Sequence, residues 1–313
     1  MKTIGFDVTG GDLGEKKLLK IINEIGLKYK NINFLVYTTN KIENTNNIFY
    51  KNVSEIIEVN EDPMLAIRRK KDSAIVIGCN DLVNEESDAF ISLGSTGALV
   101  TAGTIIVKRL PDIKRPVLPV FLSNEKTKKV RMFLDVGATV DIDAQDLVNN
   151  AKLAVEYMKN EYNINNPSIR LLNIGIEENK GTKVYKEAYQ LLKEDIELNF
   201  LGNIEGYDLL TGENDITIMG GFEGNIVLKT LEGSMEFFKE NLKTMFTKNI
   251  FKKIFAIFFQ KDLKDLKEKV NPHKNPCTPI LGIRKKIIKI HGGASEEQVF
   301  NALEKVIKEI MES

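Results

Sequence analysis

Residues 216–230 of the chain read ITIMGGFEGNIVLKT, a short apolar run followed by a glycine-rich turn and a segment with helical character. Glycine lets backbone N–H groups approach a ligand closely, and the N-terminus of a helix carries partial positive charge. The pattern therefore predicts a strand, a turn and a helix that together bind an anion such as phosphate. Asn225 and Lys229 are four residues apart, so they share one face of the expected helix and place a mobile cation beside the anion.

The same alternation of apolar runs and helix-like stretches extends over the first 235 residues. Expected strands include 4–8, 34–37, 74–77, 89–92, 117–121, 132–136, 169–174, 200–201 and 216–219, and expected helices include 16–29, 63–69, 98–109, 143–161 and 183–193. This alternation predicts an α/β fold, with a mostly parallel sheet flanked by helices. Ligands bind at the carboxyl ends of the strands in such sheets, and most of the glycine-rich segments follow an expected strand.

Composition excludes several classes of function. The 313 residues carry 44 Lys plus Arg and 44 Asp plus Glu, so the net charge is zero and nucleic-acid binding is not expected. With 2 Cys, 2 His and no Cys-x-x-Cys pair, we expect no disulfide framework, no metal site and a reducing, cytoplasmic location. The N-terminus lacks a signal-peptide pattern, and no apolar run approaches the roughly 20 residues of a spanning helix.

The stretch 235–270 differs in kind from the rest, because it holds seven of the 16 Phe residues together with Lys at 243, 248, 252, 253 and 261. Helical spacing of Phe251, Ile254, Phe255 and Phe258 is typical of a basic amphipathic helix that lies in a membrane interface. A helical hairpin that packs on its twin in a dimer explains the pattern equally well, and the two roles are compatible. No linker divides the chain, so we expect a single domain, 1–313, with this protruding helical arm inserted.

Further polar or glycine-rich loops follow other expected strands. Small residues and hydroxyls at a helix start suit an anion, a lysine offers a cation, and a histidine offers a hydrogen-bond donor or acid. Each loop also has a structural explanation, such as capping of a helix by Asp12 or Ser95, or closure of a loop by Asp135. With the opening loop, the candidates for one phosphate-handling pocket are Gly10, Gly11, Asp12, Ser95, Thr96, Gly97, Asp135, Asn173, Lys180, Asn203, Glu205, Gly221, Phe222, Gly224, Asn225, Lys229 and His291.

Taken in order, these loops resemble one family, the bacterial phosphate acyltransferase PlsX of phospholipid synthesis. The matching segments are Gly10-Gly11-Asp12, Gly94 to Ala98, Arg115-Pro116, Leu134 to Ala138, Leu171 to Gly175, Asn203 to Gly206, Gly221 to Asn225 with Lys229 to Gly233, and His291-Gly292. No single segment is specific, but eight in the same order over nearly the whole chain are.

The resemblance implies a fold like that of phosphotransacetylase and isocitrate dehydrogenase. It also implies formation of acyl phosphate from acyl-[acyl carrier protein] and inorganic phosphate, without a cofactor or metal. The family forms homodimers and associates peripherally with the membrane through the arm. On this basis, Lys229 and the loop backbone are expected to hold phosphate, while Asn225 orients it or polarises the carbonyl. Ser95, Thr96 and Lys180 complete the site, and His291 is a candidate acid toward the leaving thiolate. Carrier protein and coenzyme A are alternative donors, and the acyl chain length is open.

This chain departs from the family pattern at five positions, with Thr9 in place of Met, Ser95, Thr139 and Thr182 in place of Asn, and Gly220 in place of Asp. A buried polar group left without its partner costs about 1–3 kcal/mol, so such changes are rarely neutral. Either the partners changed too, or the substrate changed, or activity was lost. Two alternatives follow from this. One is a related acyl-phosphate enzyme for another thioester, such as a short-chain phosphotransacylase or an amino-acid reductase component with Cys277 as acyl carrier. The other is a non-catalytic scaffold at the membrane surface.

Overall fold

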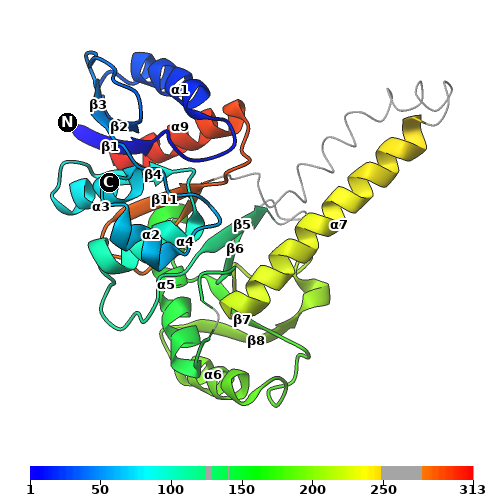
Figure 1. Cartoon of the computed structure of the whole chain (residues 1–313). Helices are drawn as coiled ribbons and strands as arrows, with labels where there is room; N and C mark the ends of the chain where they lie inside the picture. Colours follow the sequence, from blue (N-terminus) through cyan, green and yellow to red (C-terminus); the bar gives the residue numbers. More distant parts are fainter. Residues whose placement is uncertain (124–128, 140, 248–276, 313) are drawn as a thin grey trace. The chain divides into compact units, whose positions relative to one another are not determined.

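In the computed structural model, which describes residues 1–123, 129–139, 141–247 and 277–312, the chain divides into two compact units (Figure 1). Unit 1 comprises Met1–Leu118 and Asn275–Ser313, and unit 2 comprises Pro119–Lys274. Each unit has its own sheet flanked by helices, which confirms the expected α/β class while dividing the strands between two sheets. That the chain acts as a single domain stays a prediction.

The sheet of unit 1 has the strand order β10-β11-β4-β1-β2-β3. Strand β10 runs antiparallel to β11, and the other pairings are parallel. The carboxyl ends of β1, β4 and β11 therefore meet at one edge. The strands are β1 (Lys2–Asp7), β2 (Ile32–Thr38), β3 (Ile48–Asn52), β4 (Ala89–Ser92), β10 (Cys277–Pro279) and β11 (Lys286–Ile290). The helices are α1 (Glu15–Lys28), α2 (Pro63–Arg69), α3 (Ala74–Val83), α4 (Thr96–Ala102), which continues as a π-helix (Gly103–Val107), and α9 (Glu296–Glu312).

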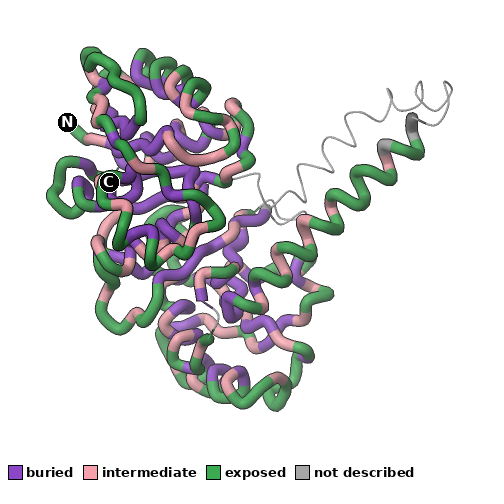
Figure 2. Tube along the Cα trace, in the orientation of Figure 1, coloured by how far each residue is buried: buried purple, intermediate pink, exposed green. Residues whose placement is uncertain are grey.

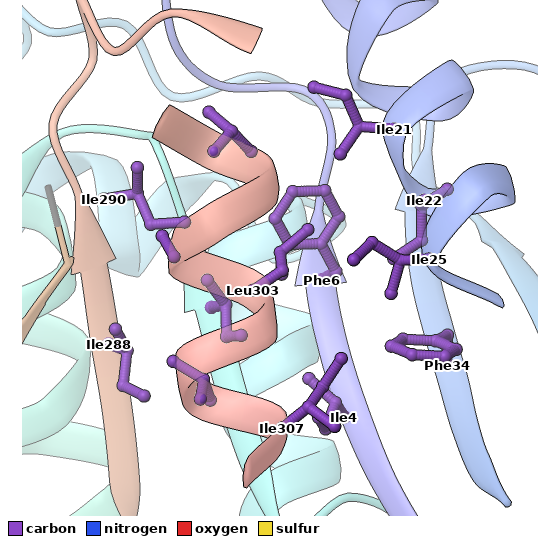
Figure 3. Packing of buried hydrophobic residues seen from close by; sticks show 14 of the residues in the cluster. Ile4, Phe6, Ile21, Ile22, Ile25, Phe34, Ile288, Ile290, Leu303 and Ile307 are labelled. Carbon is purple, nitrogen blue, oxygen red and sulfur yellow. The ribbon is translucent and has the colours of Figure 1, made fainter. Parts of the chain in front are cut away.

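The core of unit 1 lies between its sheet and helices α1 and α9. Ile4 and Phe6 of β1 point toward these helices and pack with Ile22 and Leu303 (Figure 3). Side chains alternate along a strand, so the neighbouring Asp7 faces the opposite side. The apolar core thus fixes the direction of a buried carboxylate at the end of β1.

The sheet of unit 2 has the strand order β5-β6-β9-β7-β8, with β5 antiparallel to β6 and the other pairings parallel. The loops after β6, β9, β7 and β8 therefore share one edge. The strands are β5 (Pro119–Ser123), β6 (Val130–Leu134), β7 (Ser168–Asn173), β8 (Asn199–Glu205) and β9 (Ile216–Ile218). The helices are α5 (Ala144–Tyr162), α6 (Lys183–Glu194), a 3₁₀ turn (Gly206–Asp208) and α7 (Gly221–Thr247).

Helix α7 begins in the glycine-rich loop and continues unbroken into the expected arm. Its second half extends beyond the sheet of unit 2 and is mostly exposed (Figures 1 and 2). The rest of the expected arm, 248–270, lies outside the described residues. No helix in the described part of the chain is long and apolar enough to cross a bilayer.

The expected strand at 74–77 is wrong, because these residues open helix α3. Most of α3 is buried, including Ile75, Val76, Cys79 and Leu82. A helix buried on several sides presents the same short apolar run as a buried strand, so periodicity does not separate the two.

Candidate active site

In unit 1 the loops after β1, β4 and β11 meet at the carboxyl edge of the sheet. A Cβ added at Gly10 would be 2.6 Å from the Gly94 backbone, so these two loops are in direct contact. The Asp12 N–H donates to the Gly292 carbonyl at 2.9 Å, which joins the third loop. The structure thus brings together the candidates predicted in this unit, Gly10, Gly11, Asp12, Ser95, Thr96, Gly97 and His291.

Two of these side chains are exposed at the edge. Asp12 does not cap α1, since the N-cap residue is Gly14 and has no side-chain bond, so the capping explanation is wrong. His291 is exposed, and its Nδ1 accepts the N–H of Gly293 at 3.2 Å. The imidazole is therefore oriented by its own loop.

A buried polar cluster that was not predicted lies behind these loops. Asp7 accepts the Ser92 hydroxyl at 2.6 Å, and the Lys289 ammonium donates to the carbonyls of Leu93, at 2.9 Å, and Ile290. Burial raises the pKa of Asp7, although its hydrogen bonds oppose the shift. Burial also lowers the pKa of Lys289 to about 8, against the attraction of nearby carboxylates. The available signal was a lysine inside an apolar run immediately before His291.

In unit 2 the first turn of α7 lies directly against the loop after β6. A Cβ added at Gly224 would be 1.9 Å from the Asp135 carbonyl oxygen, and one added at Gly221 would be 2.2 Å from the Thr139 carbonyl oxygen. The buried Asp135 carboxylate accepts the N–H groups of residues 137, 138 and 139 at 2.9–3.1 Å and the Thr139 hydroxyl at 2.7 Å. Asp135 therefore shapes this loop, as its structural explanation supposed, and a direct contact with ligand stays a prediction.

The polar side chains of α7 follow at the same place. Asn225 packs on the loop, where a Cβ added at Gly137 would be 3.3 Å from its Cβ. Lys229 lies one turn further along and pairs with Glu232 at 2.7 Å, with 63% of its side chain exposed. Phe222 is also exposed. The first N–H groups of a helix have no intrahelical partner, so this turn presents donors beside an amide and a mobile cation.

A second polar cluster lies after β7 and β8 of the same sheet. The Asn173 amide donates to the Asn203 side-chain oxygen at 3.3 Å and to the Lys180 carbonyl at 3.1 Å. Asn203 in turn donates to the Glu177 carbonyl at 2.8 Å. The two amides thus fix the loop between β7 and α6 through its carbonyls. The Lys180 side chain is exposed, and its ammonium lies 3.9 Å from the Glu177 carboxylate. Glu205, at the end of β8, is partly exposed.

The residues that depart from the family pattern have partners in this fold. The Thr9 hydroxyl donates to Asp7 at 2.6 Å, and the Thr139 hydroxyl donates to Asp135. Ser95 caps α4 by accepting an N–H at 3.4 Å, as its structural explanation supposed, and Thr182 caps α6 in the same way at 3.5 Å. The hydroxyls therefore take part in local hydrogen bonding.

At Gly220 a neighbouring carboxylate lies where the missing side chain would begin. A Cβ added there would be 2.4 Å from a carboxylate oxygen of Glu223, so the Glu223 carboxylate fills the adjacent space. The Gly220 N–H donates to the Tyr185 hydroxyl at 2.9 Å. Burial, reinforced by Glu223, raises the pKa of Tyr185. A carboxylate is thus present at the start of α7 although position 220 has none.

Cys277 does not have the character of an acyl carrier. It is buried, and burial raises the pKa of its thiol. A thiol nucleophile needs exposure and a lowered pKa.

Comparison with known proteins agrees with this architecture. A model of the family described as fatty acid synthesis protein matches residues 2–312. A phosphate acyltransferase of Staphylococcus haemolyticus is 35% identical over 305 residues, covering 97% of this chain and 93% of that protein. One of Thermoanaerobacter pseudethanolicus is 34% identical over 307 residues, covering 96% and 91%.

Solved structures show the same fold at lower identity. A branched-chain phosphotransacylase from Enterococcus faecalis has a TM-score of 0.63 at 14% identity and covers 99% of both chains. A phosphotransacetylase from Streptococcus pyogenes has a TM-score of 0.61 at 14% identity, covering 100% of this chain and 94% of the other. The matching loops, the two mostly parallel sheets and the full-length matches lead to one conclusion: the chain belongs to the fatty acid synthesis protein family, the PlsX family.

Proposed function

We propose that this protein transfers an acyl group from a fatty acyl thioester to inorganic phosphate, producing acyl phosphate for phospholipid synthesis. Family membership and relatives named phosphate acyltransferase support the reaction. The single structural observation that carries it is the approach of Gly221 and Gly224 to the loop after β6, because it places the first turn of α7 and Asn225 directly against that loop.

The reaction needs no protein nucleophile. A phosphate oxygen attacks the thioester carbonyl carbon, the new C–O bond forms, and the C–S bond breaks to release a thiolate that takes up a proton. Holding both reactants in place can contribute about 7–11 kcal/mol, and one donor to the developing oxyanion about 3–4 kcal/mol.

Residue roles follow from the chemistry of the side chains. Lys229 and the first turn of α7 bind phosphate, while Asn225 orients it or polarises the carbonyl. Ser95, Thr96 and Lys180 are additional ligand contacts, and His291 is the candidate acid for the thiolate. For Thr96, Lys180, Asn225, Lys229 and His291 the assignments rest on exposure and on position at the strand ends, with charge added for the lysines. Ser95 is buried, so its assignment rests on position alone.

Helix α7 offers a matched pair of lysines that tests the central assignment. Lys229 pairs with Glu232, and Lys239 pairs with Glu236, both at 2.7 Å and with i,i+3 spacing. A hydrogen bond to a charged group is worth about 1.5–3 kcal/mol, so Lys229→Ala should lower kcat/KM for phosphate by about 10- to 150-fold, whereas Lys239→Ala should not.

The assay follows acyl phosphate by trapping with hydroxylamine, with acyl thioesters on carrier protein and on coenzyme A. Equal loss in both variants, or in neither, would refute the role of Lys229. No acyl phosphate from any donor, with phosphate binding retained, would favour the non-catalytic scaffold.

The finer features of the proposal are the donor, the assembly and the location. We expect acyl carrier protein as the preferred donor, a homodimer, and a cytoplasmic protein bound peripherally to membranes through 235–270. Phe237 and Phe238 are exposed on α7, so replacing both with Ser should weaken sedimentation with anionic vesicles. Unchanged sedimentation would show that these two side chains do not contribute to membrane binding. Light scattering would measure whether the protein is a dimer.

A further inference from the structure

A row of polar side chains crosses the carboxyl ends of three neighbouring strands in unit 1. Asp7 of β1 and Lys289 of β11 are both in register with Ser92 of β4. Residues in register on parallel strands project from the same face of the sheet, so the three side chains lie side by side. The adjacent Phe6 and Ile288 project from the other face and belong to the apolar core (Figure 3). Packing of the core therefore fixes the direction of the polar row.

One end of the row anchors the loop after β4. The Ser92 hydroxyl donates to the Asp7 carboxylate at 2.6 Å and accepts the N–H of Gly94 at 2.9 Å. The same carboxylate accepts the N–H and the hydroxyl of Thr9 at 2.8 and 2.6 Å. Asp7, Ser92 and Leu93 are all buried. The start of this loop, including the Leu93 carbonyl, is thus held firmly by its neighbours.

Lys289 connects the anchored loop to the loop that carries His291. Its ammonium donates to the Leu93 carbonyl at 2.9 Å and to the carbonyl of Ile290, whose peptide bond leads into His291. Gly292 lies at the same place, since a Cβ added there would be 3.7 Å from the Leu93 carbonyl oxygen. One ammonium therefore sets the position of the His291 loop relative to its neighbour.

Burial of this ammonium indicates a purpose beyond filling the core. A buried charge pair is often no more stabilising than apolar side chains of similar size. Ile287 is fully buried two residues earlier on the same face of β11, so this face accepts an apolar side chain. An ammonium adds what such a side chain lacks, namely directed hydrogen bonds to two carbonyls at the strand ends.

We propose that Lys289 is a positioning residue for His291, which it holds in place through the peptide bond between Ile290 and His291. The inference rests on the proposed function, in which His291 donates the proton to the leaving thiolate. A displacement of about 1 Å costs about 100-fold in rate, so Lys289→Met should lower kcat by about 10- to 100-fold. The KM for phosphate should stay the same, because Lys229 and the first turn of α7, which are assigned to phosphate, belong to unit 2.

Lys286 provides the matched control, because it lies at the amino end of the same strand. Its ammonium pairs with Glu309 of α9 at 3.1 Å and is partly buried. Lys286→Met therefore also removes an ion pair from β11, but away from the loops, and should leave kcat unchanged. An equal loss of kcat in Lys286→Met and Lys289→Met would reveal a general effect on the fold and overturn the inference.

A double-mutant cycle with His291→Ala tests the path of the effect. If Lys289 acts through His291, adding Lys289→Met to His291→Ala should lower kcat by less than about twofold more. Full additivity, or a rise in the KM for phosphate at unchanged kcat, would overturn the inference. If Lys289→Met fails to fold, Lys289→Gln replaces it in the cycle, since its shorter side chain cannot reach both carbonyls; unchanged kcat in that variant would also overturn the inference.

Hydrogen exchange separates this inference from the proposed function. The Gly293 and Ala294 N–H groups donate to the Nδ1 and the carbonyl of His291, at 3.2 and 3.0 Å. In a peptide covering 291–295, Lys289→Met should exchange at least about tenfold faster than the wild type and the control variant. If no protein makes acyl phosphate but exchange responds in this way, the positioning role stands and the proposed function fails. Unchanged exchange would overturn the inference even in an active enzyme.

Discussion

Adding one methyl group at two glycines of the same helix should have opposite effects. Gly224 and Gly233 both lie in α7, but a Cβ at Gly224 would be 1.9 Å from the Asp135 carbonyl oxygen, while one at Gly233 would meet nothing within 4 Å. Carbon atoms contact backbone favourably only beyond about 3.5 Å, so Gly224→Ala must move the helix or the loop by at least about 1 Å.

The magnitudes follow from packing and helix propensity. Replacing Gly by Ala inside a helix stabilises it by about 1 kcal/mol, which is the expected gain for Gly233→Ala. Gly224→Ala adds overpacking of about 1–3 kcal/mol, which offsets or exceeds that gain. A displacement of about 1 Å at the phosphate-binding turn should also lower kcat/KM by about 100-fold, and Gly233→Ala should leave it unchanged.

Urea unfolding measures the first effect, and acyl phosphate formation measures the second. The midpoint should rise for Gly233→Ala and stay level or fall for Gly224→Ala, at an unchanged m-value. If Gly224→Ala were as stable and as active as Gly233→Ala, the contact between α7 and the loop would not hold the turn in place, and the assignment of this turn would be refuted.

Three further predictions concern the charged groups of the fold. Burial lowers the pKa of Lys289 to about 8 from its ordinary 10.5, so between pH 8 and 10.5 the unfolded chain binds more protons than the folded one. The free energy of unfolding of the wild type should therefore rise relative to that of Lys289→Met as the pH increases from about 8 to 10. Urea unfolding measures both, and equal changes with pH in the two proteins would contradict this. Arg131 is buried and donates to the carbonyl and the side chain of Asn214, so Arg131→Met should lower the free energy of unfolding by at least about 2 kcal/mol, and Arg131→Lys should recover only part of it because it lacks the planar fork. Glu223→Ala should lower turnover and Gly220→Asp added to it should restore much of the loss, which kinetics of the single and double variants would measure; full activity of Glu223→Ala would remove the carboxylate from the mechanism.

The α/β class could be predicted from the sequence, because apolar residues repeat with different periods in strands and helices. The sheet edge that carries the loops could be predicted too, because parallel strands have their carboxyl ends at the same edge. The sequence was not sufficient for the division into two sheets, since strand order depends on contacts between distant segments. Strand β3 and helix α9 were not among the expected elements either.

The site was predictable where backbone geometry requires glycine, as at Gly221 and Gly224. It was less predictable where a side chain acts on its own loop. Asp135 is a candidate contact for ligand, and the described hydrogen bonds of its carboxylate are to the backbone and the hydroxyl that follow it. Lys289 was missed because a lysine in a strand gives no local sign that its ammonium will donate to the carbonyl of Leu93, nearly 200 residues earlier in the chain.

The departures from the family pattern bear on whether the chain is a catalyst or a scaffold. Each buried polar group without a partner costs about 1–3 kcal/mol. When a binding site has lost its role, selection removes such groups only if the whole protein becomes too unstable, so they accumulate. In the described part of the chain, the buried side-chain polar atom without a hydrogen bond is the Ser87 hydroxyl. Ser87 precedes β4, at the amino end of that strand, and so lies away from the edge that carries the loops. The substituted hydroxyls at that edge are bonded, and Glu223 fills the space beside Gly220. The hydrogen bonds of the substituted hydroxyls favour a site that still binds its ligands over one that has decayed.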